Sequence, residues 1–117
     1  MATSFQEPMR LQLPTDRLIL GTLLDGRNLA ANIAAEIDRS RNYINQRMGP
    51  LHDYGLVTKV GPVEGTGLYE ITPKGGAAYL LADRYGKIED FEALVEERAE
   101  FIEIRGPELV DHFDGDS

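Results

Sequence analysis

The residues best suited to molecular recognition lie in one short stretch, Ser40–Arg47, with the sequence SRNYINQR. Arginine pairs well with guanine, and asparagine and glutamine pair well with adenine, in the DNA major groove, which admits an α-helix. The stretch therefore predicts a base-reading face made of Arg41, Asn42, Asn45 and Gln46. The alternative is an ordinary solvated helix face. Such faces usually carry Glu and Lys, and asparagine is a poor helix former, so residue type favours DNA reading.

A second set of residues is suited to holding DNA phosphates, which position a protein on the duplex without reading its sequence. Its members carry positive charge or hydroxyl groups, and several lie at the start of the same predicted helix, where backbone amides favour anions. The set consists of Arg27, Arg39, Ser40, Tyr43, Arg47, Lys59 and Thr66. Lys59 is the single basic residue of segment 56–71, so that segment is equally well explained as a cover for the core.

Catalytic and metal chemistry find no support in the residue pattern. His52 and His112 are isolated, without the spacing of a metal pair or a nucleophile partner. The chain has no cysteine, which excludes disulfides and thiolate metal sites. Asp111, Asp114 and Asp116 lack the spacing of an EF-hand loop and its closing Glu. The sequence predicts no enzyme, no metal, no cofactor and no small-molecule ligand.

The net charge of −8 is concentrated at one end of the chain. Residues 1–86 hold nine Lys/Arg and nine Asp/Glu, whereas residues 87–117 hold three basic and eleven acidic residues. The first part can therefore still present a basic face to nucleic acid. Excess carboxylate with only three lysines favours the cytoplasm of a halophile. No apolar run approaches the roughly 20 residues of a membrane span, and no signal peptide is visible, so a cytoplasmic protein is expected.

Apolar spacing and capping residues predict the elements that position the candidate face. Residues 1–13 lack a sustained period and are expected to form a flexible N-terminal arm. Thr15, Asn28, Ser40 and Thr72 are the predicted N-caps of the following helices. The expected elements, within a domain over 14–86, are helices over 15–24, 28–37, 41–54 and 73–85 and strands over 56–60 and 68–71.

The C-terminal part predicts an added acidic helix over 87–105 and a disordered acidic tail over 106–117. The helix carries a broad apolar face that is suited either to packing on its own domain or to pairing with a second subunit. The second alternative is favoured, because DNA-binding proteins of this kind commonly read two half-sites as symmetric dimers. The predicted dimer interface consists of Ile88, Phe91, Leu94, Val95, Phe101 and Ile102.

Four short motifs resemble haloarchaeal winged-helix DNA-binding proteins of the phage phiH repressor-like type. They are the helix around Ile33–Ile37, SRNYIN at 40–45, DYGLV at 53–57 and GLYEIT at 67–72. The resemblance covers about residues 13–86. It implies a mainly α fold with a small β-hairpin, a winged helix-turn-helix. It also implies double-stranded DNA as partner and transcriptional repression, with SRNYINQR as the reading helix.

Two functions are therefore expected from the sequence. The first is a dimeric, sequence-specific transcriptional regulator, probed most directly at Arg41 and Asn45. The second is a winged-helix module that binds a protein and never DNA, which the acidic C-terminus and the weakly charged hairpin favour.

Overall fold

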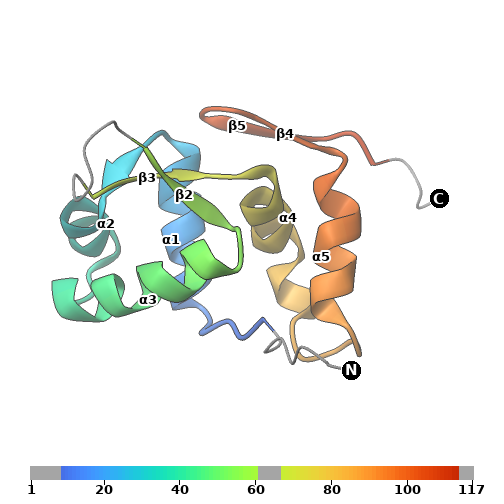
Figure 1. Ribbon diagram of the computed structural model, residues 1–117, viewed down its shortest axis with the longest axis horizontal. Helices are drawn as coiled ribbons and strands as arrows, with labels where there is room; N and C mark the ends of the chain where they lie inside the picture. The colour runs from blue at the N-terminus through green and yellow to red at the C-terminus, as the bar shows by residue number, and fades with distance from the viewer. Residues whose placement is uncertain (1–8, 61–66, 114–117) are drawn as a thin grey trace, which may run out of the picture.

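The computed structural model describes residues 9–60 and 67–113 and shows a mixed α/β arrangement. In that part of the chain five α-helices surround one apolar core, and a small antiparallel sheet lies at its edge (Figure 1). The helices are α1 (Thr15–Leu24), α2 (Ala30–Ile37), α3 (Arg41–Asp53), α4 (Pro73–Leu81) and α5 (Phe91–Ala99), with a short 3₁₀ helix η1 (Ala82–Arg84) after α4. None of these helices is long and apolar enough to cross a membrane.

The apolar stripes of α1, α2 and α3 meet in the core, as their spacing predicted. Ile19 of α1, Ile33 of α2 and Ile44 of α3 are each 0% exposed. Burying one such side chain contributes about 1.5–3 kcal/mol, so this contact stabilises the arrangement of the three helices.

The start of α2 differs from the prediction. Asn28 was expected to cap the helix, but Asn28 and Leu29 form a short strand, β1, which pairs with the later strand β3 (Leu68–Ile71). The helix therefore begins at Ala30, and its N-cap residue, Leu29, provides no side-chain hydrogen bond. The first turn of α2 consequently keeps backbone N–H groups that no side chain caps.

The link between α2 and α3 is a three-residue turn, as expected. Asp38 ends α2 in the left-handed conformation (φ 60°). The Ser40 hydroxyl oxygen accepts a hydrogen bond from the Tyr43 amide at 3.0 Å, which confirms Ser40 as the cap of α3.

The predicted hairpin is present. Strands β2 (Val57–Val60) and β3 pair antiparallel, with Val57 opposite Ile71, and β1 completes a three-stranded sheet of order β1-β3-β2. Residues 61–66, which join β2 to β3, lie outside the described residues, and so does Thr66.

Helix α4 begins at Pro73, directly after its predicted N-cap Thr72. The Thr72 hydroxyl oxygen accepts a hydrogen bond from the Gly75 amide at 3.0 Å. Gly75 must be glycine, because a Cβ there would collide with the carbonyl oxygen of Leu56. A Cβ at Gly76 would lie 3.0 Å from the Ile102 side chain, so this position is also tightly packed.

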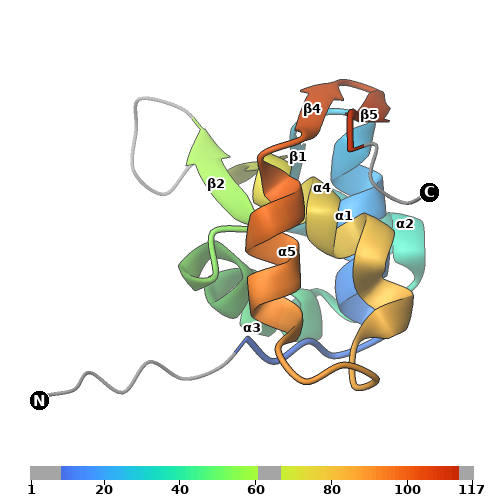
Figure 2. The ribbon, with the colours of Figure 1, turned by 90° about the vertical axis from the view of Figure 1, so that its right-hand side faces the viewer.

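The C-terminal region corrects the prediction in two ways. Helix α5 ends at Ala99 instead of continuing to 105, and a hairpin follows it (Figure 2). Its first strand, β4 (Ile102–Arg105), replaces the end of the predicted helix, and its second, β5 (Glu108–Asp111), lies in the predicted disordered tail, of which 114–117 are outside the described residues. The physical reason is the alternation of apolar and charged residues in β4 and its pairing with β5, which place Ile102, Ile104 and Leu109 over Gly76 of α4.

The predicted dimer interface is wrong for three of its six residues. Phe91, Val95 and Ile102 belong to the protein's own core, with exposed fractions of 7%, 0% and 7%. Helix α5 packs on α4 with this face, so the face is not free to bind a second subunit. Leu94 is half-buried against the same core, whereas Ile88 and Phe101 are exposed.

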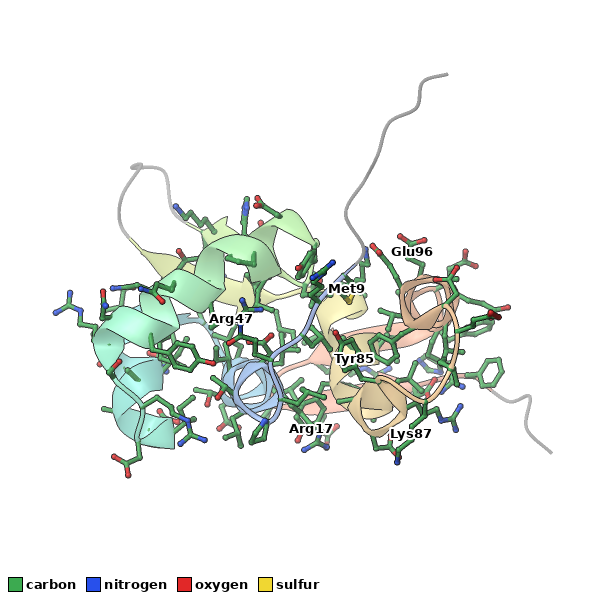
Figure 3. The ribbon with its side chains drawn as sticks, turned by 90° about the horizontal axis from the view of Figure 1, so that it is seen from below. Met9, Arg17, Arg47, Tyr85, Lys87 and Glu96 are labelled. Atoms are coloured by element: carbon green, nitrogen blue, oxygen red, sulfur yellow. The ribbon has the colours of Figure 1, made fainter. Side chains whose placement is uncertain are left out.

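The N-terminal segment also differs from the prediction. Residues 9–13 were expected to belong to a flexible arm, but Met9 and Leu11 are buried in the core. Figure 3 shows this segment running across the molecule between α3 and the α4–α5 pair. Residues 1–8 lie outside the described part of the chain.

Candidate nucleic-acid interface

Helix α3 has two sharply different faces. Ile44, Met48 and Leu51 point into the core and are at most 1% exposed. They fix the helix on α2 and on the strand that follows it. The rest of its circumference is polar, and the N-terminal half of that polar surface carries the residues predicted to read bases.

The four predicted base readers are all exposed on α3. No hydrogen bond or ion pair within residues 9–60 and 67–113 engages the side chains of Arg41, Asn42, Asn45 or Gln46. Arg41 and Asn45 also line a hollow of about 300 Å³. Its remaining wall comes from the β1–α2 junction and β3, at Leu29, Ala30, Ala31, Gly67 and Tyr69. The structure thus brings the predicted base-reading side chains together beside the sheet.

The prediction for Arg47, in contrast, is wrong. Arg47 was predicted to bind phosphate, but its side chain is buried and forms a bidentate ion pair with Asp16 of α1. Its Nε donates to Oδ1 at 2.9 Å, and its Nη2 donates to Oδ2 at 2.8 Å. Hydrogen bonding to this carboxylate raises the pKa of Arg47. Nη2 also donates to the Arg10 carbonyl at 3.3 Å, so Arg47 holds α1 and the N-terminal segment against α3.

Two more predicted phosphate ligands are engaged inside the protein. The Arg39 guanidinium donates to the Thr15 hydroxyl at 3.4 Å and to the Ile37 carbonyl at 3.2 Å. The Tyr43 hydroxyl donates to Gln12 Oε1 at 2.6 Å. Both side chains therefore tie α3 and its preceding turn to residues 12–15, and neither is free to approach a ligand without losing these bonds.

The remaining phosphate candidates lie on the surface. Arg27 forms a long, exposed ion pair with Glu70 of β3 at 3.6 Å, which contributes little stability. Lys59 is exposed on β2, with its ammonium nitrogen 5.9 Å from the centre of the Tyr69 ring. Ser40 is exposed at the start of α3, where it caps the helix.

Helix α5 lies at the other end of the molecule from the start of α3 (Figure 1). Glu96, Glu97 and Glu100 are exposed on or just after α5. In the C-terminal region Arg105 and His112 donate hydrogen bonds to Glu103, which lowers the pKa of that carboxyl to about 2. The carboxylates of α5 are therefore separated from the candidate interface, whereas Asp38 is exposed in the turn just before α3.

Sequence reasoning missed the partners beneath α3. The sequence predicted no partner for Asp16, and Gln12 was assigned to the flexible arm. The sequence offers one weak signal, since an acidic residue in an otherwise apolar helix often has a buried basic partner. The part of the chain described by the structure contains no group of three or more His, Cys, Asp or Glu residues that could hold a metal ion.

Comparison with protein-family models, with curated protein sequences and with solved structures finds no match for this chain. The functional conclusion therefore comes from the arrangement of its own residues.

Proposed function

We propose that the protein is a sequence-specific DNA-binding regulator with a winged helix-turn-helix fold, in which α3 enters the major groove. The order of α1, β1, α2, α3 and the β2–β3 hairpin supports that fold assignment, because α2 and α3 are joined by a short turn. Transcriptional repression in the cytoplasm of a halophile is part of the proposal. The resemblance of 13–86 to phage phiH repressor-like proteins supports this part.

The observation that carries the proposal is the division of α3 between support and solvent. A helix whose polar residues served only solubility would need no fixed orientation. Here one face is fixed by three buried apolar side chains and a buried ion pair, while Arg41, Asn42, Asn45 and Gln46 use none of their hydrogen-bonding capacity within the described residues. A base-reading helix requires this combination of a fixed frame and free polar groups.

The types of the four side chains define the DNA that the face fits. Asn42, Asn45 and Gln46 each present one amide, which pairs with N6 and N7 of adenine, and Arg41 pairs with O6 and N7 of guanine. We therefore expect a preferred site with several adenines close to one guanine in each half-site.

Phosphate contacts are few in this proposal. Arg27 and Lys59 remain accessible from the initial set, together with Ser40. Affinity falls steeply with salt when a protein neutralises many phosphates. A small number of cationic contacts is consequently an advantage for a protein that works in concentrated salt.

Selection of bound duplexes from random oligonucleotides at about molar KCl tests the proposal. We expect enrichment of one sequence, on which Arg41→Ala or Asn45→Ala loses about 1–3 kcal/mol of binding free energy. Lys59→Ala should weaken binding to all sequences and reduce the salt slope by about one. Lys87→Ala is the matched control, because Lys87 is exposed next to the acidic C-terminal region. Enrichment of no sequence contradicts DNA recognition, and an equal loss on all sequences contradicts base reading by Arg41 or Asn45.

The second candidate is a winged-helix module that binds a protein. The exposed carboxylates of α5 favour it, because they suit a basic partner surface and repel DNA. The same selection separates the two candidates, since a protein-binding module yields no enriched duplex at any salt concentration.

A symmetric dimer remains part of the leading proposal, because two-fold half-sites need two reading helices. Its interface cannot be the apolar face of α5, which is buried. Sedimentation of the protein with and without the selected duplex gives the stoichiometry directly.

A further inference from the structure

One side of α3 is joined to the N-terminal part of the chain by a row of polar contacts. Arg39, Tyr43 and Arg47 follow one another at intervals of four residues, so they lie along the same side of the helix and of the turn before it. Their partners are Thr15, Gln12 and Asp16 respectively, at 3.4, 2.6 and 2.8 Å. The segment 10–16 therefore contacts α3 over two turns.

Residues 9–11, at the start of this segment, are also hydrogen-bonded to three other parts of the molecule. The amide of Leu11 donates to the Tyr85 hydroxyl at 3.1 Å, and the amide of Met9 donates to Glu92 of α5 at 3.3 Å. At the C-terminal end of α3, the Tyr54 hydroxyl accepts from the amide of Arg10 at 3.1 Å. Figure 3 shows Met9 and Tyr85 on one side of the segment and Arg47 on the other.

This arrangement restrains the rotation of α3 about its own axis. The buried side chains of Ile44 and Met48 hold the helix against the core, and their close packing already limits rotation. The hydrogen bonds along one flank add a directional restraint. A rotation of a few tens of degrees would move the exposed side chains by several ångströms, far more than the roughly 0.5 Å that a recognition site tolerates.

We propose that residues 10–16 act as a brace that sets the orientation of the reading helix, and that Gln12 and Tyr43 are positioning residues for base discrimination. The inference rests on the proposed function, which supplies the readout. It assigns to Tyr43 a role different from the phosphate contact expected from the sequence.

The test compares Tyr43→Phe and Gln12→Leu with the full-length wild-type chain. Tyr43→Phe keeps the ring and removes the hydroxyl that bonds Gln12. Tyr79→Phe is the matched control, because no described residue is hydrogen-bonded to the Tyr79 hydroxyl. For each protein the dissociation constants are measured on the selected duplex and on a scrambled duplex of the same length, and urea unfolding checks that the chain is folded.

We expect Tyr43→Phe and Gln12→Leu to reduce the preference for the selected duplex by about 2- to 10-fold, which corresponds to one hydrogen bond. Binding to the scrambled duplex should stay within about twofold of wild type, and the double variant should lose no more than either single variant. Tyr79→Phe should show no loss of preference. An equal loss on both duplexes identifies Tyr43 as a phosphate contact and overturns the proposal. An unchanged preference in folded Tyr43→Phe overturns it as well.

A measurement without DNA separates the brace from the proposed function. In ¹H–¹⁵N spectra of the free protein, Tyr43→Phe should shift the signals of residues 41–46, including the side-chain amides of Asn42 and Asn45. Tyr79→Phe should leave these signals in place. If the wild-type protein selects no duplex, the proposed function fails while this comparison still decides the brace. Shifts confined to residue 43 and its immediate neighbours overturn the brace.

Discussion

Replacing Asp16 by asparagine would leave the guanidinium of Arg47 buried without a counter-charge. The carboxylate of Asp16 is 0% exposed and accepts three hydrogen bonds, two from Arg47 and one from the Gln12 amide. Removing one partner of such a buried pair costs about 3–5 kcal/mol, because the other charge stays desolvated. We therefore expect Asp16→Asn and Arg47→Met each to lose about that much of the free energy of unfolding.

This loss is large beside the total stability of about 5–15 kcal/mol that is usual for a domain. With a urea slope of about 1–3 kcal/mol per molar, the midpoint should fall by roughly 1–5 M. The midpoint is measured by equilibrium unfolding in urea, followed by far-ultraviolet circular dichroism at one fixed salt concentration. Thr58→Ala, at an exposed strand position, is a control that should change the midpoint little.

The double variant Asp16→Leu with Arg47→Met distinguishes charge pairing from simple packing. Replacing a buried ion pair by apolar residues of similar volume is often neutral or stabilising. We expect the double variant to be more stable than Asp16→Leu or Arg47→Met alone, although the Arg10 carbonyl loses its bond to the guanidinium. If the losses of Asp16→Leu and Arg47→Met simply add in the double variant, the account of a buried and mutually dependent pair is wrong.

Three further outcomes follow from local geometry. Gly75→Ala should cost about 1–3 kcal/mol or more of the free energy of unfolding, because the added methyl group would collide with a backbone carbonyl. Gly49→Ala should change this free energy by less than about 1 kcal/mol, because a Cβ there meets nothing beyond its chain neighbours, while the following Pro50 disfavours a helical residue with a Cβ. Urea unfolding measures both variants, and a tolerated Gly75→Ala contradicts the close packing at the start of α4. The pKa of Glu103, lowered to about 2 by Arg105 and His112, should rise in Arg105→Gln when its carboxyl carbon is titrated by NMR. Because the pKa of Glu103 is lowered in the folded state, the interaction of this carboxylate with Arg105 stabilises the hairpin above pH 4.5, and the stabilisation is lost as the pH falls towards 2. An unchanged pKa of Glu103 in Arg105→Gln would show that Arg105 does not cause the lowering.

The helices with clear caps and apolar stripes could be predicted closely. Ser40 and Thr72 cap the helices as expected, and the apolar positions of α2 and α3 are buried. Strand β1 could not be foreseen, because two residues carry no period and its pairing with β3 depends on a segment about 40 residues away. Strand β4 did carry an alternating pattern, but it fell within the predicted helix, and the acidic composition around β5 favoured disorder.

In the candidate site, residue type alone does not predict which arginines of α3 are exposed. Arg41 and Arg47 are the same residue type, six positions apart on one helix, and one is exposed while the other is buried. Sequence identifies the polar flank of a helix but not the segment that lies beside it. The carboxylate of Asp16 and the amide of Gln12, about 30 residues earlier, decide that Arg47 and Tyr43 are structural.

The two-sided character of α3 has a consequence for how the protein can evolve. Substitutions at the exposed positions 41, 42, 45 and 46 break no hydrogen bond or ion pair among the described residues, so they should cost little folding stability. Substitutions at 43, 44, 47 and 48 disrupt the brace or the core. Mutation can therefore explore new chemistry on the solvent side of one helix while purifying selection preserves its other side. Paralogues that descend from this chain should differ most at those four positions and least at the positions between them.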